Sequence, residues 1–282
     1  MNPLDLALAG AAGFVAGGVN ALAGGGTLLS FPVLIALGLP PVSANITNTV
    51  ALSPGYLGGV LAQRQAIADQ ARRVRRLLIP AALGGLIGSV LLLLTSDSTF
   101  RVLIPALLFI ATLLLATQDR IRVALRIGQS TGDPVTTPTV TTSTGSTAGA
   151  VPPSATGTDQ YLSDPRWLAI PVMVVAVYGG YFGAGLGIML LAVLGVVLHD
   201  TLRRLNALKQ MLALIINTTA ALFFLASGKV YWLVALVMAI TSLLGGTVGG
   251  RLAGSVKPEW LRAIVVSIGT AVAVAYAVKI WF

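Results

Sequence analysis

Long apolar stretches, separated by short basic segments, make up most of the chain. A helix of about 20 apolar residues crosses the hydrocarbon core of a bilayer, and several stretches have about that length. They cover residues 45–63, 77–95, 100–117, 205–226, 230–250 and 261–281. We therefore predict a full membrane span for each of them.

Two longer apolar runs, residues 4–38 and 167–198, are interrupted by glycines. The glycines that break these runs are Gly24, Gly25, Gly26, Gly183, Gly185 and Gly187. Each run forms either two tilted spans or a re-entrant hairpin, because irregular backbone is tolerated at membrane depth where protein shields it. Both arrangements return the chain to the side on which the run began.

The second half of the chain repeats the pattern of the first, with a constant offset in numbering (245 minus 84, which is 161). In the middle of a predicted span, the glycines that recur are Gly84, Gly85 and Gly88, matched by Gly245, Gly246 and Gly249. The same offset aligns Gly24, Gly26 and Asn45 with Gly185, Gly187 and Asn206. Duplicated apolar halves with a glycine break near the start are typical of secondary transporters.

Each half crosses the membrane an odd number of times, so the two repeats are predicted to have inverted topology. We expect an all-α integral membrane protein with repeats at residues 1–127 and 167–282. Each repeat consists of a Gly-broken hairpin or helix pair followed by three transmembrane helices. Residues 128–166 between them are rich in Thr, Ser and Pro and nearly lack bulky apolar residues. Such a segment cannot bury a core, so we predict a flexible cytoplasmic linker.

The composition excludes a soluble domain. Hydrophobic residues make up 56% of the chain and charged residues 10%, with a mean hydropathy of +0.89, whereas about a quarter of the residues in soluble domains are charged. The net charge of +9 does not indicate nucleic-acid binding, because the arginines lie in short inter-helix segments and no binding module is recognisable. The absence of cysteine excludes disulfides and thiolate metal sites.

Basic residues are distributed unevenly among the predicted loops, and this sets the orientation. Residues 64–76 hold five arginines against one acidic residue, Asp69, and the positive-inside rule places such a loop in the cytoplasm. Counting crossings from this loop places the linker inside and both termini outside. Arg101, Lys229 and Lys279 then fall outside. We therefore predict a multi-pass protein of the cytoplasmic (inner) membrane.

The glycine breaks are candidates for anion binding. Where a helix begins after a break, unpaired N–H groups and the positive end of the helix dipole bind anions without a charged side chain. Inverted repeats would bring two such ends together near the middle of the bilayer. The alternative is that the glycines only let helices pack closely. We favour binding for the breaks, and close packing for the mid-span glycines that begin at Gly84 and Gly245.

A polar cluster follows each break, at the start of the next predicted span. Its members are Asn45, Asn48 and Thr49 in the first half and Asn206, Lys209 and Gln210 in the second. Residues three apart share a helix face, and polar groups in a span are costly unless they face a cavity or the bundle interior. Lys209 is a basic residue inside the predicted span 205–226, and it aligns with Asn48. It either faces a substrate or snorkels to the cytoplasmic interface, and the matching Asn48 favours the first interpretation.

The candidate substrate-binding residues are Gly24, Gly25, Gly26, Asn45, Asn48, Thr49, Gly185, Gly187, Asn206, Lys209 and Gln210. The pair His199-Asp200 could act as a proton relay, but its place in a loop beside Arg203 and Arg204 favours a solvated pair. The chain has one histidine and lacks zinc-protease and P-loop motifs. We therefore expect no catalytic residue, no metal site, no cofactor and no enzyme activity.

Several of these features occur together in one known pattern. They are the doubled Gly-rich break, the run from Gly24 to Pro32, the following residues 44–48 and the Ser/Thr-rich central segment. Together they resemble the TauE/SafE sulfite exporter family over nearly the whole chain outside residues 128–165. The second half departs from the pattern, with Val193 in place of a proline and Leu186 between its glycines. The resemblance implies a substrate class, namely sulfite, sulfonates and related sulfur oxyanions or organic acids.

We therefore expect a secondary transporter that moves a small sulfur oxyanion (sulfite, organosulfonate or similar) across the cytoplasmic membrane by alternating access between inverted halves. An anion channel that uses the same backbone donors is an alternative, as is a transporter of other small organic acids. The expected partners are a small anionic substrate and membrane lipid, without nucleic acid. Formation of a homodimer and coupling to a proton or a sodium ion are open.

Overall fold

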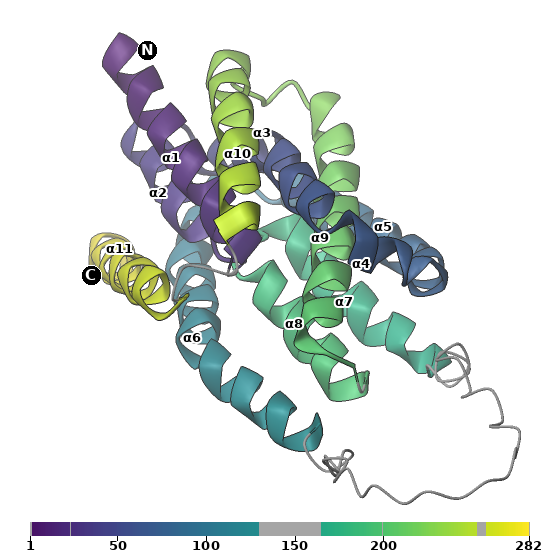
Figure 1. The fold of residues 1–282 in the computed structure, drawn as a ribbon. Coiled ribbons are helices and arrows are strands. Elements are labelled where there is room, and N and C mark those ends of the chain that lie inside the picture. Colours follow the sequence, from purple (N-terminus) through teal and green to yellow (C-terminus); the bar gives the residue numbers. More distant parts are fainter. Residues whose placement is uncertain (1, 23, 130–164, 199, 253–257, 282) are drawn as a thin grey trace, which may run out of the picture.

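The computed structural model describes residues 2–22, 24–129, 165–198, 200–252 and 258–281. Within these residues every regular element is a helix, so the predicted all-α fold is confirmed (Figure 1). The elements are α1 (Pro3–Leu22), α2 (Thr27–Ala36), α3 (Pro41–Ala62), α4 (Arg64–Ala68), α5 (Ala71–Leu94), α6 (Asp97–Gln129), η2 (Arg166–Leu168), α7 (Ala169–Tyr181), α8 (Leu186–Val197), α9 (Leu202–Leu225), α10 (Trp232–Leu252) and α11 (Pro258–Trp281). The predicted linker lies almost entirely outside the described residues.

Among the described residues, five helices are long and apolar enough to cross a membrane, namely α1, α5, α6, α9 and α10. The multi-pass membrane protein predicted from the sequence is thus confirmed. The predicted span 45–63 corresponds to α3, which has 22 residues but is not in this group. Polar residues such as Asn45, Thr47 and Asn48 lower its hydropathy, and all three are buried inside the bundle. Of the last predicted span, the described apolar part is Val265–Val278.

Two basic segments that were expected to be loops are largely helical. The span expected at 77–95 begins earlier, since α5 starts at Ala71. The span expected at 100–117 continues, since α6 runs to Gln129. Arginine favours the helical backbone nearly as well as leucine, so a helix can continue past the end of its apolar pattern.

The two glycine-broken runs form helix pairs, α1 with α2 and α7 with α8. The second helix of each pair is short, with 10 residues in α2 and 12 in α8. At 1.5 Å per residue, such helices are about 15–18 Å long, which is less than the hydrocarbon thickness of about 30 Å. These helices therefore do not cross the bilayer alone, and each pair ends its second arm within the bundle.

The two halves share one pattern of helix starts. Helices α3, α5 and α6 begin at Pro41, Ala71 and Asp97, and α9, α10 and α11 begin at Leu202, Trp232 and Pro258. The differences 202 minus 41, 232 minus 71 and 258 minus 97 all equal the offset of the sequence repeat. Helix packing follows the same repeat. Helix α1 packs on α10, and the equivalent helices α7 and α5 also pack on each other. Opposite orientation of the two repeats across a membrane stays a prediction.

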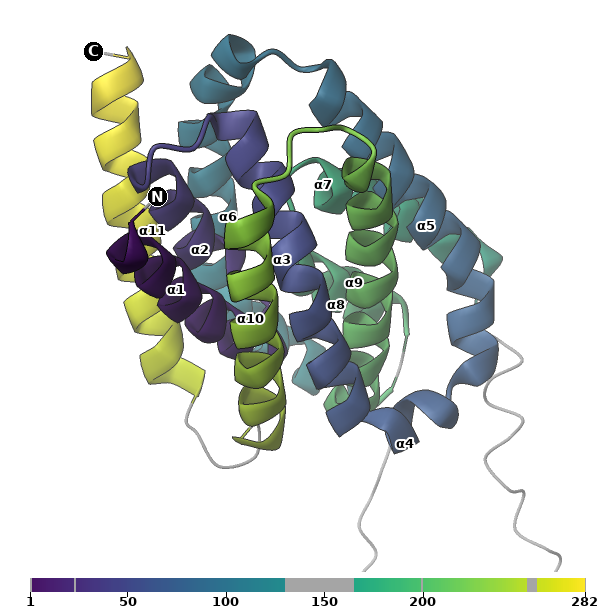
Figure 2. The same ribbon diagram turned by 90° about the horizontal axis from the view of Figure 1, so that it is seen from above.

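Helix packing divides most of the structure into two bundles that each combine both halves. We call α1, α2, α3 and α10 bundle A, and α5, α7, α8 and α9 bundle B. Within each bundle the helices contact one another extensively, and the bundles meet mainly where α3 packs against α9. Figure 2 shows α3 and α9 side by side, with α10 on one side and α5 on the other. Helices α6 and α11 pack together as a third unit.

The mid-span glycines hold helices of each bundle in close contact. A Cβ added to Gly88 of α5 would overlap the carbonyl oxygen of Val177 in α7. In the other bundle, a Cβ on Gly245 of α10 would overlap the carbonyl oxygen of Phe14 in α1. The close-packing interpretation of these glycines is therefore confirmed.

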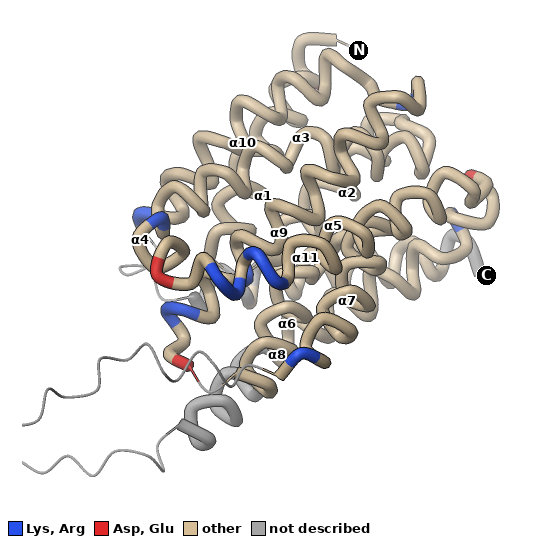
Figure 3. Tube along the Cα trace, turned by 90° about the vertical axis from the view of Figure 1, so that its right-hand side faces the viewer, with Lys and Arg blue, Asp and Glu red and all other residues tan. Residues whose placement is uncertain are grey.

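Basic residues gather at one end of the molecule. Figure 3 shows most of the Lys and Arg segments at the end where α4 lies, with few at the opposite end. We call this the α4 end. The positive-inside rule predicts that the α4 end is cytoplasmic.

Cysteine labelling tests this orientation, since the chain contains no cysteine. Gln65 near the α4 end and Lys229 in the loop before α10 are both exposed. In intact cells, we expect Lys229→Cys to react with a membrane-impermeant thiol reagent, and Gln65→Cys to react only after permeabilisation. Labelling of both positions from the same side contradicts the predicted topology.

Candidate substrate-binding site

The two glycine breaks touch each other inside the bundle. The first lies between α1 and α2 in bundle A, and the second between α7 and α8 in bundle B. A Cβ added to either Gly24 or Gly187 would lie 2.9 Å from the Cα atom of the other residue. Both glycines are buried. The backbones of the two breaks are therefore in direct contact across the bundle interface, at a distance that leaves no room for a side chain.

Three of the break glycines also adopt backbone angles that other residues rarely reach. The φ angle is +90° at Gly24, +75° at Gly183 and +76° at Gly185, in the region that costs an L-residue about 1–2 kcal/mol. Gly25 and Gly185 face α6, where an added Cβ would lie 3.3 Å from Leu115 Cδ2 and 3.5 Å from Ala111 Cα. A Cβ on Gly26 would overlap the carbonyl oxygen of Ala16 in α1.

Asn20 caps the first break, a role that its sequence position did not single out. Its side-chain Oδ1 accepts a hydrogen bond from the backbone N–H of Gly26 at 2.7 Å. One of the N–H donors expected to be open at the start of α2 is therefore already used. The Asn20 Nδ2 is buried and has no hydrogen-bond partner among the described residues.

Lys209 lies beside the second break. Its side chain is part of a residue that is only 1% exposed, and its Cδ atom would be 3.6 Å from a Cβ placed on Gly187. A snorkelling lysine would bring its ammonium group to the surface of the protein, and this burial contradicts that alternative. Because Gly187 belongs to the first turn of α8, Lys209 is next to the positive end of that helix dipole.

Asn45 and Asn206, which align in the repeat, each cross the interface between the bundles. Asn45 Nδ2 donates to the carbonyl oxygen of Tyr181, the last residue of α7, at 2.8 Å. Asn206 Nδ2 donates to Gln63 Oε1 next to the end of α3, at 3.1 Å. The first bond lies near the start of α3, and the second lies near the start of α9 at the α4 end. The two asparagines therefore join the bundles at opposite ends rather than lining one pocket.

The centre of the same interface is also polar. Ser53 Oγ of α3 donates to the carbonyl oxygen of Asn217 in α9 at 3.2 Å. Both residues are buried. Hydrogen bonds therefore join the two bundles near both ends of α3 and in its middle, and the one from Asn45 reaches α7 instead of α9.

The remaining polar candidates differ in how their groups are used. Thr49 Oγ1 donates to the carbonyl oxygen of Asn45 within α3 at 3.0 Å. Asn48 is 1% exposed, and its Oδ1 has no hydrogen-bond partner among the described residues. Both amide atoms of Gln210 are likewise buried and without a partner there, although its side chain packs tightly against Gly59 of α3. Buried polar atoms without partners are uncommon, so Asn48 and Gln210 stay candidates for contact with a ligand.

Aromatic packing fixes the second break against α2 and α6. Phe182 follows directly after α7, and its ring lies edge-on to Phe31 of α2 at a centroid distance of 5.3 Å and to Phe100 of α6 at 6.2 Å. The three phenylalanines are fully buried. The break is thus held by packed rings on one side and by the Gly24 contact on the other.

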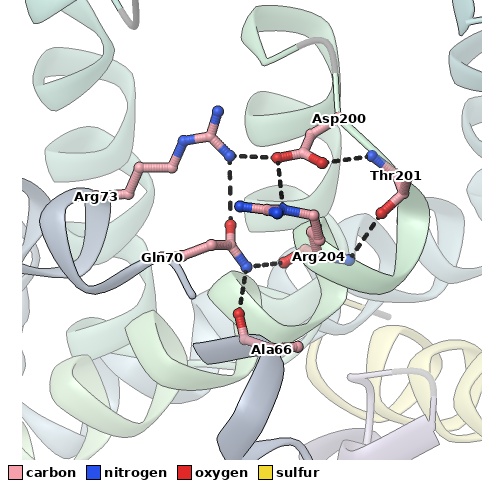
Figure 4. A network of polar contacts seen from close by, with 6 residues as sticks. All are labelled: Ala66, Gln70, Arg73, Asp200, Thr201 and Arg204. Atoms are coloured by element: carbon pink, nitrogen blue, oxygen red, sulfur yellow. Dashed lines mark hydrogen bonds and ion pairs between the residues drawn. The ribbon is translucent and has the colours of Figure 1, made fainter. Parts of the chain in front are cut away.

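Asp200 belongs to an ion-pair cluster at the α4 end and is not the solvated loop residue expected from the sequence. Its Oδ2 accepts from Arg73 of α5 and, at 3.1 Å, from Nε of Arg204 in α9 (Figure 4). Gln70 Nε2 donates to the carbonyl oxygen of Arg204 at 3.0 Å. The side chain of Asp200 is 11% exposed. His199 lies outside the described residues.

Comparison with known proteins gives a consistent result. A family model described as sulfite exporter TauE/SafE matches residues 9–276. A probable membrane transporter protein of Haemophilus influenzae is 25% identical over 267 residues, covering 93% of this chain and 90% of that protein. The probable membrane transporter protein YfcA of Escherichia coli K12 is 22% identical over 283 residues, covering 95% and 88%. The comparison with solved structures gives no match.

Because the two breaks are in contact, an alanine substitution should destabilise the protein to different extents at two glycines that have nearly the same backbone angle. Gly24 and Gly38 have φ angles of +90° and +88°, but a Cβ on Gly38 would meet nothing within 4 Å. Both Gly24→Ala and Gly38→Ala bear the cost of the left-handed backbone, and only Gly24→Ala also pushes against Gly187. We expect Gly24→Ala to be less stable than Gly38→Ala by about 1–3 kcal/mol. Equal melting temperatures of the two purified variants in detergent would show that the breaks do not press on each other.

Proposed function

The chain belongs to the sulfite exporter TauE/SafE family and is a membrane transporter, and from this premise we propose that it carries a small sulfur oxyanion, such as sulfite or an organosulfonate, across the cytoplasmic membrane. The observation that supports this substrate class most directly is the burial of Lys209 beside the second glycine break. Ionisable groups inside spans usually mark substrate or ion pathways, and the ammonium group of Lys209 would attract an anion bound beside Gly187. The N-terminal end of α8 would stabilise the same anion through its dipole and its N–H groups.

The proposed site is asymmetric. In the second half, the start of α8 and Lys209 together offer positive charge, and the amide of Gln210 follows Lys209 in sequence. In the first half, the amide of Asn48 stands in the place of Lys209, and Asn20 already binds the N–H of Gly26. We therefore assign the charge of the substrate to the second half. The buried Asn48 amide is the candidate for a neutral hydrogen bond to it.

Alternating access is proposed to occur by movement of bundle A relative to bundle B. The two halves of the sequence are interleaved in both bundles, so the halves cannot rock against each other as separate bodies. The bundles meet mainly at α3 and α9, and the breaks beside this interface are buried. This arrangement fits an occluded state, in which a substrate at the breaks is shielded from both sides.

The alternatives are an anion channel and a transporter of other small organic acids. A channel would use the same donors, but its flux would not saturate at low substrate concentration. Uptake by proteoliposomes at increasing sulfite concentration separates the two, since a carrier saturates. Thermal stabilisation by sulfite, sulfate, thiosulfate, an organosulfonate and acetate then ranks the substrates, because a bound ligand raises the melting temperature by mass action.

Lys209→Met tests the proposed charge. We expect the affinity for sulfite to fall by about 1.5–3 kcal/mol, the range for hydrogen bonds to charged groups. Arg203→Met is the matched control, because Arg203 is on the same helix, one turn before Asn206, and is exposed. The measurement is the shift in melting temperature with sulfite for purified variants. An unchanged sulfite affinity in Lys209→Met would remove the lysine from the site.

Removal of either interface asparagine, Asn45 or Asn206, should make the interior of the interface accessible from opposite sides of the membrane. Loss of one neutral hydrogen bond, about 0.5–1.5 kcal/mol, changes the population of an open state by about 2- to 12-fold. In a Ser53→Cys background, Asn206→Ala should increase thiol labelling from the α4 end, and Asn45→Ala should increase it from the other end. Labelling is measured in right-side-out and inside-out vesicles. An increase from the same side for both variants contradicts movement at the α3–α9 interface.

A further inference from the structure

A basic pocket of about 300 Å³ opens at the α4 end, between α5 and the start of α7. Its lining residues are Arg73, Arg76 and Leu77 on one side and Pro165, Arg166, Leu168 and Ala169 on the other. These described lining residues include three arginines and no acidic residue. The pocket is therefore suited to an anionic group, and it is separate from the glycine breaks.

The arginines of the pocket differ in burial. Arg73 is 7% exposed, and its guanidinium is held by Asp200 and by Gln70 Oε1, the latter at 3.4 Å (Figure 4). Arg76 and Arg166 are exposed, so their long side chains can close on a ligand. Guanidinium groups bind phosphate oxygens in a planar, two-pronged geometry. One fixed and two adjustable guanidiniums make a site for a phosphate group.

Apolar surface continues from this pocket along the two helices. On α5, Ile79 is 63% exposed, and on α7, Ile170 and Val174 are 68% and 64% exposed. Trp167 of η2, just before α7, is 57% exposed, and tryptophan is enriched where a membrane protein meets the headgroup region. A ligand that fills both the basic pocket and this apolar surface has a phosphate head and hydrocarbon chains.

We propose that the pocket formed by Arg73, Arg76 and Arg166 binds the headgroup phosphate of an anionic phospholipid, whose acyl chains lie along α5 and α7. Basic pockets between transmembrane helices on the cytoplasmic side bind such headgroups. The bound lipid would span α5 and α7 and so strengthen the contact between two helices of bundle B that come from different halves of the chain.

The repeat supplies an internal comparison. The offset between the halves aligns the three arginines with uncharged or acidic residues. Arg73, Arg76 and Arg166 correspond to Val234, Val237 and Asp5. Helices α1 and α10 nevertheless pack against each other as α7 and α5 do. The three arginines are therefore not needed for this helix contact, and their restriction to one end of the molecule indicates a ligand at that end.

The test titrates the purified protein in a nonionic detergent with phosphatidylglycerol, phosphatidylcholine or inorganic phosphate. The pocket variant is Arg76→Gln/Arg166→Gln, which leaves the Arg73–Asp200 pair intact. The control is Arg72→Gln/Arg75→Gln, which removes the same charge from exposed positions of α5 that do not line the pocket. Binding is read from the rise in melting temperature and from lipid retained by the protein in native mass spectrometry.

We expect phosphatidylglycerol to stabilise the parent protein and the control variant, with phosphatidylcholine far weaker. Affinity of the pocket variant for phosphatidylglycerol should be at least about tenfold below that of the control. Equal weakening in both variants would mean that the lipid only senses surface charge, and it would overturn the proposal. Stabilisation by inorganic phosphate equal to that by phosphatidylglycerol would also overturn it, by assigning the pocket to a free anion.

Discussion

Backbone contact at glycines, between helices from opposite halves of the chain, is the constraint on which the rest of the structure depends. Lipid tails are as apolar as the side chains that face them, so helices in a bilayer associate through van der Waals packing and hydrogen bonds. Here an added Cβ on Gly17 would overlap the carbonyl oxygen of Ser242, and one on Gly180 would overlap that of Gly85. Both contacts join a helix of the first half to a helix of the second. The halves therefore interleave, and the units that pack as bundles are not the units that are repeated in sequence.

Interleaving explains why the polar interface lies where it does. Each bundle is held internally by close glycine contacts, whereas the bundles are joined by single neutral hydrogen bonds, from Asn45 of α3 to α7, from Asn206 of α9 to Gln63 and from Ser53 of α3 to α9. A neutral hydrogen bond contributes about 0.5–1.5 kcal/mol, so these contacts can exchange without disrupting either bundle. The same sequence thus yields rigid packing within the bundles and a weaker, polar contact between them, beside the glycine breaks.

Much of the fold follows from the sequence, because apolar length and the internal repeat can be read without knowing any helix contact. They locate the membrane helices and the glycine breaks, and the spacing of Gly84 and Gly88 indicates close packing. Bundle composition does not follow, since it depends on which helix each glycine meets. The helical arginine segments are also missed, because a helix can continue past the end of its apolar pattern. Asp200 was misread because its partner Arg73 is far away in the sequence, on α5.

At the candidate site, too, the sequence identifies the residues but not the contacts between them, and the two breaks show this most clearly. The sequence identifies Gly24, Gly187 and Lys209 as candidates, and the structure places these three together. The repeat predicts that the breaks are equivalent, yet Asn20 occupies the N–H of Gly26 in the first half. The residue equivalent to Asn20 is Tyr181, whose hydroxyl lies 3.4 Å from Thr95 Oγ1, so it does not supply the same cap. The two breaks are therefore not equivalent: an N–H of the first is bound by the protein's own side chain, whereas the buried Lys209 lies beside the second.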